Sequence, residues 1–535
     1  MQSGLRNWCS VFVGCFLFLA NTFPSMGTEP SHGSRILEEV RGHLERSQGL
    51  PLDVRAQAEA LTQYYVSPKA RLLWFQEGRA DQLIEVLKKL QDDGLTRTDR
   101  WVKRLLFIKQ SLRARDTRFE ALVEVTFSAA LLQIVSDLRL GKFTRYKKLL
   151  HERTLARRVV ENPALDAVRD GFSINAVLDS VQPSDIDYQA MKSRLSTFVQ
   201  IRERGGWPLV RVGPKLKLGD HGPDVRDLRQ RLAASGELPM SRVSGDRFDK
   251  ELQTAVKLFQ RRHGLATSGL VSRRTQLAMN VPVETRIRQL QVNLERWRWF
   301  ALPQGQSRWI INTAAQRMFV RDRAGKTRAF RIVATHACQD AAAFDTSVAS
   351  LIYHPEYRLD NEAAARLVLP LLKKNPDMLG ERIKLKPHEA LRTVPNVVRP
   401  DWVDWKAYSQ SDFPYDVIIE PGPANPLGTF KFVLGKIDDI SVHGQPRKKL
   451  PFRQRLSCVA LKESGTDFKA LVPELERPPS QDEKGEAAPP APLRIDLPDG
   501  ASVVFVYATI WLDSGGELVF GPDPLGKDAK LNRFL

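Results

Sequence analysis

The spacing of apolar residues changes along this chain, and the changes divide it into parts with different secondary structure. Between residues 34 and 206, apolar residues recur every three or four positions among many charged ones, a pattern that predicts helices. The sequence Gly-Gly-Trp-Pro at residues 205–208 breaks this pattern. We therefore expect a helical scaffold domain over residues 34–208 and further domains after it, because 535 residues are too many for one hydrophobic core.

A compact unit of three short helices is predicted over residues 212–282. Asp224 can cap its first helix, and a second helix is expected to begin at Asp249. Gly264 stands where a glycine commonly ends a helix. A third helix is expected from Thr275 to Asn280, so the unit needs only a small core of its own.

The last part of the chain, residues 286–535, begins as a helical connector and continues as strand-like runs. Residues 355–415 look more helical and irregular than their surroundings, as an insertion does. Residues 476–492 are rich in Pro, Glu, Ala and Lys and predict a solvated loop. The fold class expected for the whole chain is multidomain α+β. The predicted strands are Trp309–Asn312, Arg317–Val320, Phe330–Ala334, Asp416–Ile419, Thr429–Val433 and Ser502–Leu512.

The first 27 residues have the composition of a secretory signal peptide. Arg6 precedes an apolar run from Trp8 to Ala20, and the small residues Ser25 and Gly27 follow. An uncleaved membrane anchor is the alternative, but this run is shorter than the roughly 20 residues that span a bilayer. No later stretch of the sequence looks transmembrane. We expect a cleaved signal peptide at residues 1–27 and export to the periplasm.

The chain is strongly basic, with 81 Lys and Arg residues against 62 Asp and Glu residues and a net charge of +19. Such a surface attracts acidic polymers. The charge is spread along the sequence without any recognisable nucleic-acid motif, so no nucleic acid is expected as a partner. Cell-wall peptides, with their free carboxylates, fit the charge equally well. The nine histidines are scattered and suggest no metal site.

Two cysteines, Cys338 and Cys458, remain once the predicted signal peptide is removed. A secreted chain of this length does not need a disulfide in order to fold. The two cysteines can form one bridge, or one of them can be a nucleophile that is kept reduced. Composition does not decide between these alternatives.

Cys458 follows His443 by fifteen residues. A cysteine needs a base or a positive neighbour to react as a thiolate near neutral pH, and histidine is the usual one. The two side chains can meet if their segments form adjacent strands. Gly444 follows the histidine, and backbone N–H groups near Ser457 and Cys458 can stabilise an oxyanion. On this chemistry alone, acyl transfer is one hypothesis and a chance spacing of Cys and His is the other.

Residues 216–282 resemble the peptidoglycan-binding module found on many cell-wall enzymes. The resemblance rests on a glycine turn, on apolar residues such as Val225 and Phe259, and on the run His-Gly-Leu at residues 263–265 before Gly269. It covers the whole unit. It implies that peptidoglycan is a partner of this protein, bound in a groove between helices.

The region around the Cys–His pair resembles the catalytic domain of the L,D-transpeptidases. The motifs are the Pro-Gly turn at residues 421–428, then His443-Gly444, then Cys458 among small residues. The domain order is similar, over nearly the full chain, to that of the large periplasmic subgroup with a helical scaffold domain and a peptidoglycan-binding module. The insertion at residues 360–410 lies where that subgroup has a capping subdomain over the active site. Further segments that agree are residues 205–208, 293–296 and 506–509.

The resemblance implies a cysteine-dependent acyl transfer on peptidoglycan. Cys458 would attack the carbonyl of the third residue of a tetrapeptide stem and expel the terminal D-alanine, while His443 takes the thiol proton. The side-chain amine of a neighbouring stem would then resolve the thioester and leave a 3–3 cross-link. The resemblance implies no cofactor and no metal, and it makes other cell-wall enzymes candidate partners.

The family signature around the nucleophile is Ser-x-Gly-Cys-x-Arg, and this chain departs from it. Arg455, Ser457 and Ala460 stand where the family has Ser, Gly and Arg. A side chain in place of the glycine restricts the oxyanion turn, and loss of the arginine removes a cation. Three interpretations stay open. They are an active but divergent transpeptidase, an inactive relative that binds peptidoglycan as a structural or regulatory protein, and a different acyl transfer on the same scaffold.

A few other residues could be functional but have simpler explanations. His336 lies two residues before Cys338, yet the subgroup has no nucleophile there, so a structural or incidental role is expected for Cys338. His354 precedes a proline and is expected to pack or to lie at the surface. Trp297 and Trp299 are expected to pack the connector against the catalytic domain, with stacking on a sugar as the alternative.

Overall fold

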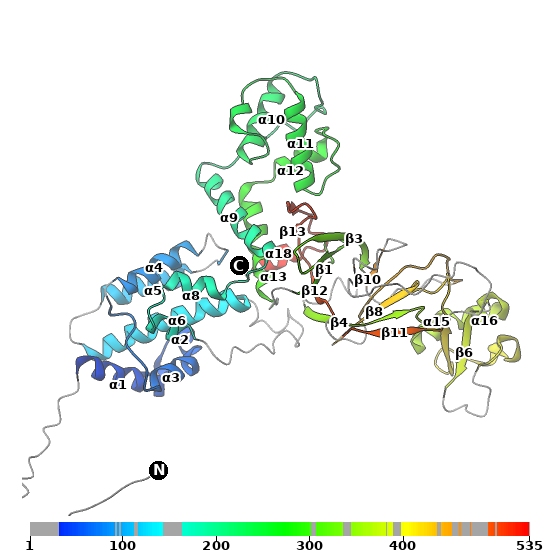
Figure 1. Cartoon of the computed structure of the whole chain (residues 1–535), viewed down its shortest axis with the longest axis horizontal. Coiled ribbons are helices and arrows are strands. Elements are labelled where there is room, and N and C mark those ends of the chain that lie inside the picture. Colours follow the sequence, from blue (N-terminus) through cyan, green and yellow to red (C-terminus); the bar gives the residue numbers. More distant parts are fainter. Residues whose placement is uncertain are drawn as a thin grey trace, which may run out of the picture.

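The computed structural model describes residues 31–533 apart from internal gaps. The gaps are residues 77, 91–93, 96–97, 112–115, 143–162, 301–305, 335–343, 381, 389–396, 436–439, 452–458, 462–470, 472–490 and 498–499. A helical domain, a three-helix module and a β-rich domain follow one another along the chain, so the predicted α+β organisation is confirmed (Figure 1). The predicted signal peptide and most of the predicted loop at 476–492 lie outside the described residues.

The helical domain is built around one long central helix. Its helices are α1 (His32–Glu45), α2 (Leu52–Arg55), α3 (Ala58–Val66), α4 (Arg79–Lys89), α5 (Asp99–Gln110), α6 (Thr117–Leu140), α7 (Ala164–Arg169) and α8 (Ile174–Val181). α6 contacts α1, α2, α3, α5, α7 and α8, and all eight helices contribute to a single apolar cluster. The apolar spacing seen in the sequence is therefore the spacing of helix faces turned toward this shared core.

Among the described helices, α6 is long and apolar enough to cross a membrane. Most of its apolar window, 83%, is buried inside the protein. A helix that is apolar on every side is what the centre of a helical domain requires. Its contacts with the surrounding helices therefore account for its composition.

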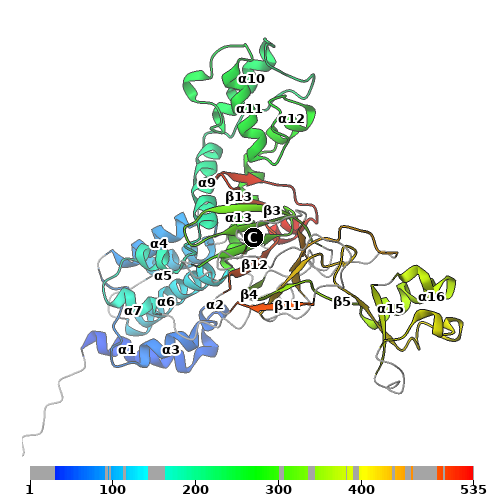
Figure 2. The same cartoon turned by 45° about the vertical axis from the view of Figure 1, so that its right-hand side comes forward.

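Two helices carry the three-helix module. α9 (Ile186–Glu203) leads into the module, α13 (Val283–Arg298) leads out of it, and the two pack side by side. The module stands at one end of this pair, away from the helical domain (Figures 1 and 2). The sequence boundary at residue 208 groups α9 with the helical domain. Its core residues, such as Phe198, nevertheless belong to a cluster that α13 and the β-rich domain share.

The module has the three helices that the sequence predicts, α10 (Pro223–Ala234), α11 (Lys250–Arg262) and α12 (Arg273–Met279), around its own core. The Asp249 carboxylate caps α11 as expected, and Gly264 lies just beyond its end with a φ of 61°. The predicted Asp224 cap is wrong. Gly222 holds the cap position, Pro223 occupies the first turn because its missing N–H is not needed there, and Asp224 follows within that turn.

The β-rich domain is a sheet that closes on itself. Its strands are β1 (Arg308–Asn312), β2 (Arg317–Arg321), β3 (Thr327–Ala334), β4 (Phe344–Tyr353), β8 (Phe430–Leu434), β9 (Ser441–His443), β10 (Val459–Leu461), β11 (Leu493–Asp496) and β12 (Ser502–Val506). The order is β11-β4-β12-β1-β2-β3-β10-β9-β8, and β4 also pairs with β8 to complete a ring of eight strands. A hairpin of β13 (Ile510–Leu512) and β14 (Leu518–Phe520) and the short helix α18 (Lys527–Asn532) end the chain.

Successive side chains along the ring strands point in turn into two different cores. On β1, Trp309 and Ile311 point into the closed sheet, whereas Ile310 faces the helix pair α9 and α13. Val504 on the neighbouring β12 also faces the helices. Because both faces of these strands are buried, their sequences are continuous apolar runs rather than alternating ones.

An aromatic stack joins the module to the β-rich domain. The His263 ring at the end of α11 lies between Phe259 and Phe520, with ring centroids 3.9 and 5.7 Å away. On β14, Phe520 also stacks on Phe198 of α9, at 5.7 Å. Because three parts of the chain meet in one stack, the module has a defined orientation relative to the closed sheet.

The insertion at residues 355–415 is a small lobe with its own apolar core, here called the cap. It lies on the far side of the β-rich domain from the helical domain (Figures 1 and 2). It contains α15 (Asn361–Leu367), α16 (Leu369–Lys374) and a sheet of β5 (Tyr357–Arg358), β7 (Tyr415–Ile419) and β6 (Ile383–Pro387) in that order. The helical prediction is therefore only partly correct, because β5 and β6 are strands; they pair with β7, which contains the strand predicted at 416–419.

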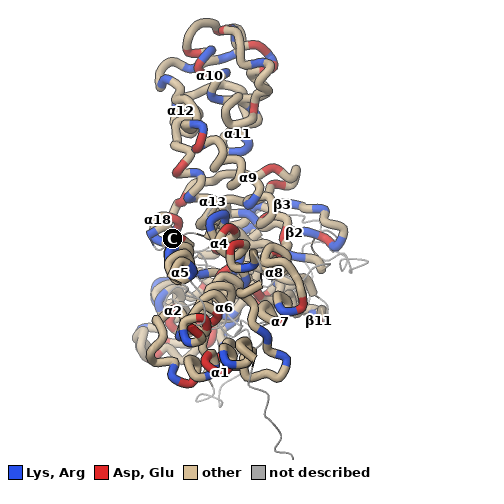
Figure 3. Tube along the Cα trace, turned by 90° about the vertical axis from the view of Figure 1, so that its left-hand side faces the viewer, with Lys and Arg blue, Asp and Glu red and all other residues tan. Residues whose placement is uncertain are grey.

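Charged residues are distributed over the surface in both signs. Basic and acidic residues alternate along the helical domain and the module in the view of Figure 3. This view agrees with the sequence, in which the excess of positive charge is spread along the chain.

Candidate functional site

The candidate site lies on β9, the short strand between β8 and β10. His443 is its last residue, with Lys431 as its antiparallel neighbour on β8 and Ala460 as its parallel neighbour on β10. Side chains of directly paired residues lie on the same face of a sheet. Val442 and Phe432, one position along, point into the closed core. The row that contains His443 therefore lies on the outer face.

His443 is fully buried and is held by one hydrogen bond. Its Nδ1 lies 2.7 Å from the carbonyl oxygen of Gly444. A carbonyl oxygen only accepts, so Nδ1 carries the proton, and Nε2 of the neutral ring keeps a free lone pair. Within the described part of the chain, no group forms a hydrogen bond with Nε2. This is the form in which a histidine accepts a proton.

The environment of His443 favours the neutral ring. Burial lowers its pKa to about 4; the hydrogen bond to Gly444 opposes this shift, and the positive charge of Lys431 adds to it. Burial also lowers the pKa of the Lys431 ammonium. His443 is therefore uncharged near pH 7 and able to act as a base.

The predicted turn at residues 421–428 is organised by Asn425, which is fully buried. Its Nδ2 donates to the carbonyl oxygens of Pro355 (2.8 Å) and Ile419 (3.0 Å), and its Oδ1 accepts the N–H of Leu427 (2.9 Å). One side chain thus ties together the entrance of the cap, its last strand and the turn.

Gly428 brings this turn against the residues that follow His443. Its φ is 67°, and a Cβ at this position would lie 2.7 Å from the backbone N of Gln445 and 2.8 Å from the carbonyl carbon of Gly444. Only glycine allows both the conformation and the close approach. The Gly444 N–H is in turn bound to the carbonyl oxygen of Phe430 at 3.1 Å. The turn therefore supports the backbone that carries His443.

Two of the four predicted site residues, His443 and Gly444, belong to the described part of the chain. Ser457 and Cys458 lie outside it. The description resumes at Val459, the first residue of β10, and β10 pairs with β9. The adjacent strands that the hypothesis requires are thus present, and the contact between Cys458 and His443 stays a prediction.

Cys338 also lies outside the described residues. Its predicted structural role, and the alternative of a disulfide with Cys458, therefore stay predictions. Among the described residues, no group of three or more His, Cys, Asp and Glu side chains could hold a metal ion.

His354 lies beside the same turn. The sequence analysis predicted only that this residue packs or lies at the surface. Its φ is 50°, and its backbone N–H donates to the carbonyl oxygen of Thr429 at 2.9 Å. Residues other than glycine rarely adopt this left-handed conformation. The residue stands at the end of β4, where the chain enters the cap.

Trp297 packs the connector against the β-rich domain, as expected, whereas Trp299 lies beside Gly141 at the end of α6. Both are buried, and the Trp299 indole N–H donates to the Glu295 carboxylate at 3.1 Å. Because neither ring is accessible, the alternative role of stacking on a sugar is wrong.

Lys431 and Asn425 are the site residues that the sequence analysis missed. Lys431 carries a signal, because it is a charge inside the otherwise apolar strand run at 430–434. Asn425 carries little signal, since an asparagine beside prolines is typical of any turn.

Two family comparisons identify the accessory domains. Residues 59–195 match the family described as Scaffold domain, and residues 221–279 match the family of peptidoglycan binding domains. Both matches fall on domains predicted from the sequence, in the predicted order. The chain thus has both accessory domains of the resemblance, followed by a β-rich domain with a cap insertion.

The comparison with solved structures matches the crystal structure of an L,D-transpeptidase fragment from Xylanimonas cellulosilytica. The match covers 55% of this chain and 99% of that chain, at 14% sequence identity and a TM-score of 0.15. So low a TM-score gives no argument about the site. The comparison with curated proteins gives no match.

Proposed function

We propose that this protein is an exported L,D-transpeptidase of the periplasm, with Cys458 as nucleophile and His443 as base. One observation carries the proposal. His443 is neutral and buried, with Nδ1 anchored and Nε2 unpartnered among the described residues, on the strand beside β10. β10 begins directly after Cys458. A base with a free lone pair beside a cysteine-bearing segment is the arrangement that thiol activation needs.

The proposed reaction has two steps. The Cys458 sulfur attacks the carbonyl carbon of the third residue of a tetrapeptide stem, and His443 Nε2 takes the thiol proton. The amide C–N bond breaks, the proton passes to the departing D-alanine amine, and a thioester remains. The side-chain amine of a second stem then attacks the thioester, gives up a proton to His443 and releases the thiol, which leaves a 3–3 cross-link.

The accessory domains support peptidoglycan as the substrate. The peptidoglycan binding domain at residues 221–279 gives the chain a second place to hold the polymer. The stack around His263 and Phe520 fixes the orientation of this domain relative to the β-rich domain. The peptidoglycan binding domain and the candidate active site therefore have a defined relative position. Other cell-wall enzymes are candidate partners of the scaffold domain.

A second candidate function is that of an inactive relative that binds peptidoglycan as a structural or regulatory protein. The observation that favours it is the altered signature, since Arg455, Ser457 and Ala460 occupy its Ser, Gly and Arg positions. The binding domain would be retained in this case, while the thiol would not turn over.

Covalent labelling of the thiol separates the two functions. The mature full chain is reduced, mixed with a carbapenem, which acylates the family's cysteine, and measured by intact mass. The proposal predicts one adduct that is retained in Cys338→Ala, lost in Cys458→Ala and formed much more slowly in His443→Asn. If the folded protein with a free thiol gives no adduct, the transpeptidase proposal fails and the binding protein remains.

A further inference from the structure

The cross-strand row that contains His443 holds a second polar side chain, Lys431. The row runs on the outer face of the closed sheet from Ile352 on β4 through Lys431 and His443 to Ala460 and Val333 on β3. The residues at both ends are partly open, and Val333 is 39% exposed, whereas His443 in the middle is buried. The row is thus closed over His443 and Ala460 and partly open at Lys431, Ile352 and Val333.

Lys431 is a half-buried cation without a counter-ion among the described residues. No ion pair or hydrogen bond of its ammonium occurs there, and burial lowers its pKa. On the strand that carries Lys431, the neighbours Phe430 and Phe432 point the opposite way, into the core. A half-buried ammonium without a partner carries a desolvation cost, and an anion that pairs with it would offset this cost.

His443 adds a second unsatisfied group directly beside this cation. Its buried Nε2 has no described hydrogen-bond partner, and it is the next residue to Lys431 in the row. The Nε2 lone pair accepts a proton, and in the proposed reaction it takes the thiol proton, so it does not bind an anion. Lys431, whose ammonium only donates, is the group in this row that can pair with an anion.

On the other side of His443 stands Ala460, where the family signature has an arginine. The chain thus lacks a cation on β10 and has one on β8, at the same level of the sheet. Both positions flank the histidine, so a lysine on β8 can face the same bound group as an arginine on β10.

From this geometry we propose that Lys431 binds the C-terminal carboxylate of the peptide that donates the acyl group. The inference rests on the proposed function and names its substrate class, a peptide with a free C-terminal carboxylate. Lys431 then selects against peptides that end in an amide, because an amide leaves the ammonium unpaired. The residue binds substrate and transfers no proton.

The test compares two ligands on the full mature chain with Cys458→Ser, which prevents turnover. One ligand is a tetrapeptide stem with a free C-terminal carboxylate, and the other is the same peptide with a C-terminal amide. We expect the acid to bind roughly tenfold or more tightly than the amide, since charge-assisted hydrogen bonds contribute on this scale. Lys431→Met should bring the ratio close to one, and Lys431→Arg should keep most of it.

Lys326→Met is the matched control, because Lys326 is an exposed lysine in the β2–β3 turn. It should leave the ratio of acid to amide affinity unchanged. Lys431→Met removes only an unpaired charge, so its melting temperature should equal that of the parent or exceed it, which separates lost binding from lost folding.

Two results would overturn the inference: survival of the acid preference in Lys431→Met, or binding of neither ligand. If the acid preference survives and Lys431→Met shifts the pH dependence of Cys458 alkylation by a haloacetamide, the cation acts on the thiolate instead. Failure of the proposed function gives a different result from failure of this inference. The wild type would then form no carbapenem adduct, while Lys431→Met would still abolish the preference for the acid.

Discussion

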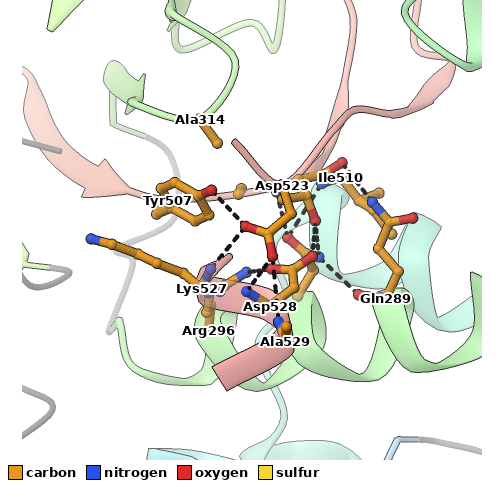
Figure 4. A network of polar contacts seen from close by, with 12 residues as sticks. Gln289, Arg296, Ala314, Tyr507, Ile510, Asp523, Lys527, Asp528 and Ala529 are labelled. Atoms are coloured by element: carbon orange, nitrogen blue, oxygen red, sulfur yellow. Dashed lines mark hydrogen bonds and ion pairs between the residues drawn. The ribbon is translucent and has the colours of Figure 1, made fainter. Parts of the chain in front are cut away.

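The Asn293 side chain is hydrogen-bonded to Thr509 at both of its ends. Its Oδ1 accepts the Thr509 backbone N–H at 2.9 Å, and its Nδ2 donates to the Thr509 hydroxyl at 2.8 Å. The hydroxyl then donates to Asp528. Asp528 in turn pairs with Arg296 (Figure 4). These hydrogen bonds join residues 293–296 to residues 506–509, two segments that the sequence analysis noted separately. They thus tie α13 to the end of the closed sheet.

Replacing Asn293 should destabilise this junction strongly. Asn293 is fully buried, so Asn293→Leu removes the oxygen that accepts the N–H groups of Thr509 and Ile510, while the Thr509 hydroxyl keeps Asp528. Each unsatisfied buried group costs about 1–3 kcal/mol, and we expect a total loss of about 2–5 kcal/mol in urea denaturation. Asn175→Leu, at an exposed position of α8, is the control and should change stability by less than about 1 kcal/mol. Equal losses for both variants would contradict the assignment.

Replacing Gly428 should disturb the backbone under His443. In Gly428→Ala the new Cβ would meet backbone atoms of Gly444 and Gln445 at less than 3 Å, in addition to the cost of a positive φ. Gly380→Ala is the control, because Gly380 has a φ of 74° and open space around its Cβ position. The control isolates the conformational cost of about 1–2 kcal/mol. We expect Gly428→Ala to lose at least about 1 kcal/mol more in urea denaturation, and equal losses would show that the contact is unimportant.

The low pKa of His443 predicts a loss of stability in acid. Its pKa is about 4 in the folded chain and about 6.5 when unfolded, so the unfolded state binds more protons between these values. The contribution of the neutral ring is therefore complete above pH 6.5 and is lost as the pH falls toward 4. His443→Asn keeps a donor for the Gly444 carbonyl and removes the titration. The stability of the wild type relative to this variant should fall by up to about 3 kcal/mol between pH 7 and pH 4. A constant difference would refute the shift.

Arg262 is expected to help hold the module in place. It pairs with Glu237 in the module and with Glu517 at the start of β14, at 3.2 and 2.9 Å. Glu517→Lys puts two cations opposite each other and should widen the range of module orientations, which small-angle scattering records as a larger radius of gyration. Glu251→Lys makes the same charge change at an exposed pair inside the module and should leave the scattering curve unchanged. Identical curves for both variants would mean that the stack around His263 suffices alone.

Domain organisation was predictable because each domain has a strong local pattern. The module has capping residues and glycines at its helix ends, and the strands around Trp309 and Phe330 are short segments rich in aromatic and β-branched residues. β4 was missed because its sequence, residues 344–353, mixes Asp, Thr and Ser with apolar residues. Asp345 and Ser347 alternate with the buried Phe344, Thr346 and Val348, and the pairing with both β12 and β8 makes this segment a strand.

The candidate site was predictable only where a residue type is chemically rare. His443 and Cys458 stand out in any sequence, whereas Lys431 becomes significant only through the register that puts it beside His443. The left-handed backbone of His354 and the clash that fixes Gly428 depend on the packing of the cap entrance. Such tertiary contacts leave no local pattern in the sequence.

The buried carboxylate of Glu124 should make the helical domain less stable as the pH rises. Glu124 lies fully buried on α6 and accepts hydrogen bonds from Tyr65 Oη (2.8 Å) and from the backbone N–H of Leu73 (2.6 Å). Burial raises its pKa from 4.5 to about 7, although these hydrogen bonds oppose the shift. Between these values the folded state holds a proton that the unfolded state has lost, so the stability present below pH 4.5 is lost as the pH rises toward 7. The loss is at most about 3 kcal/mol, and Glu124→Gln should remove it.

Hydrogen exchange of α6 peptides in urea, compared between wild type and Glu124→Gln at pH 4.5 and pH 7.5, measures the difference. If wild type and variant respond equally to pH, the carboxylate has an ordinary pKa and is held ionised by its three donors, including Trp74.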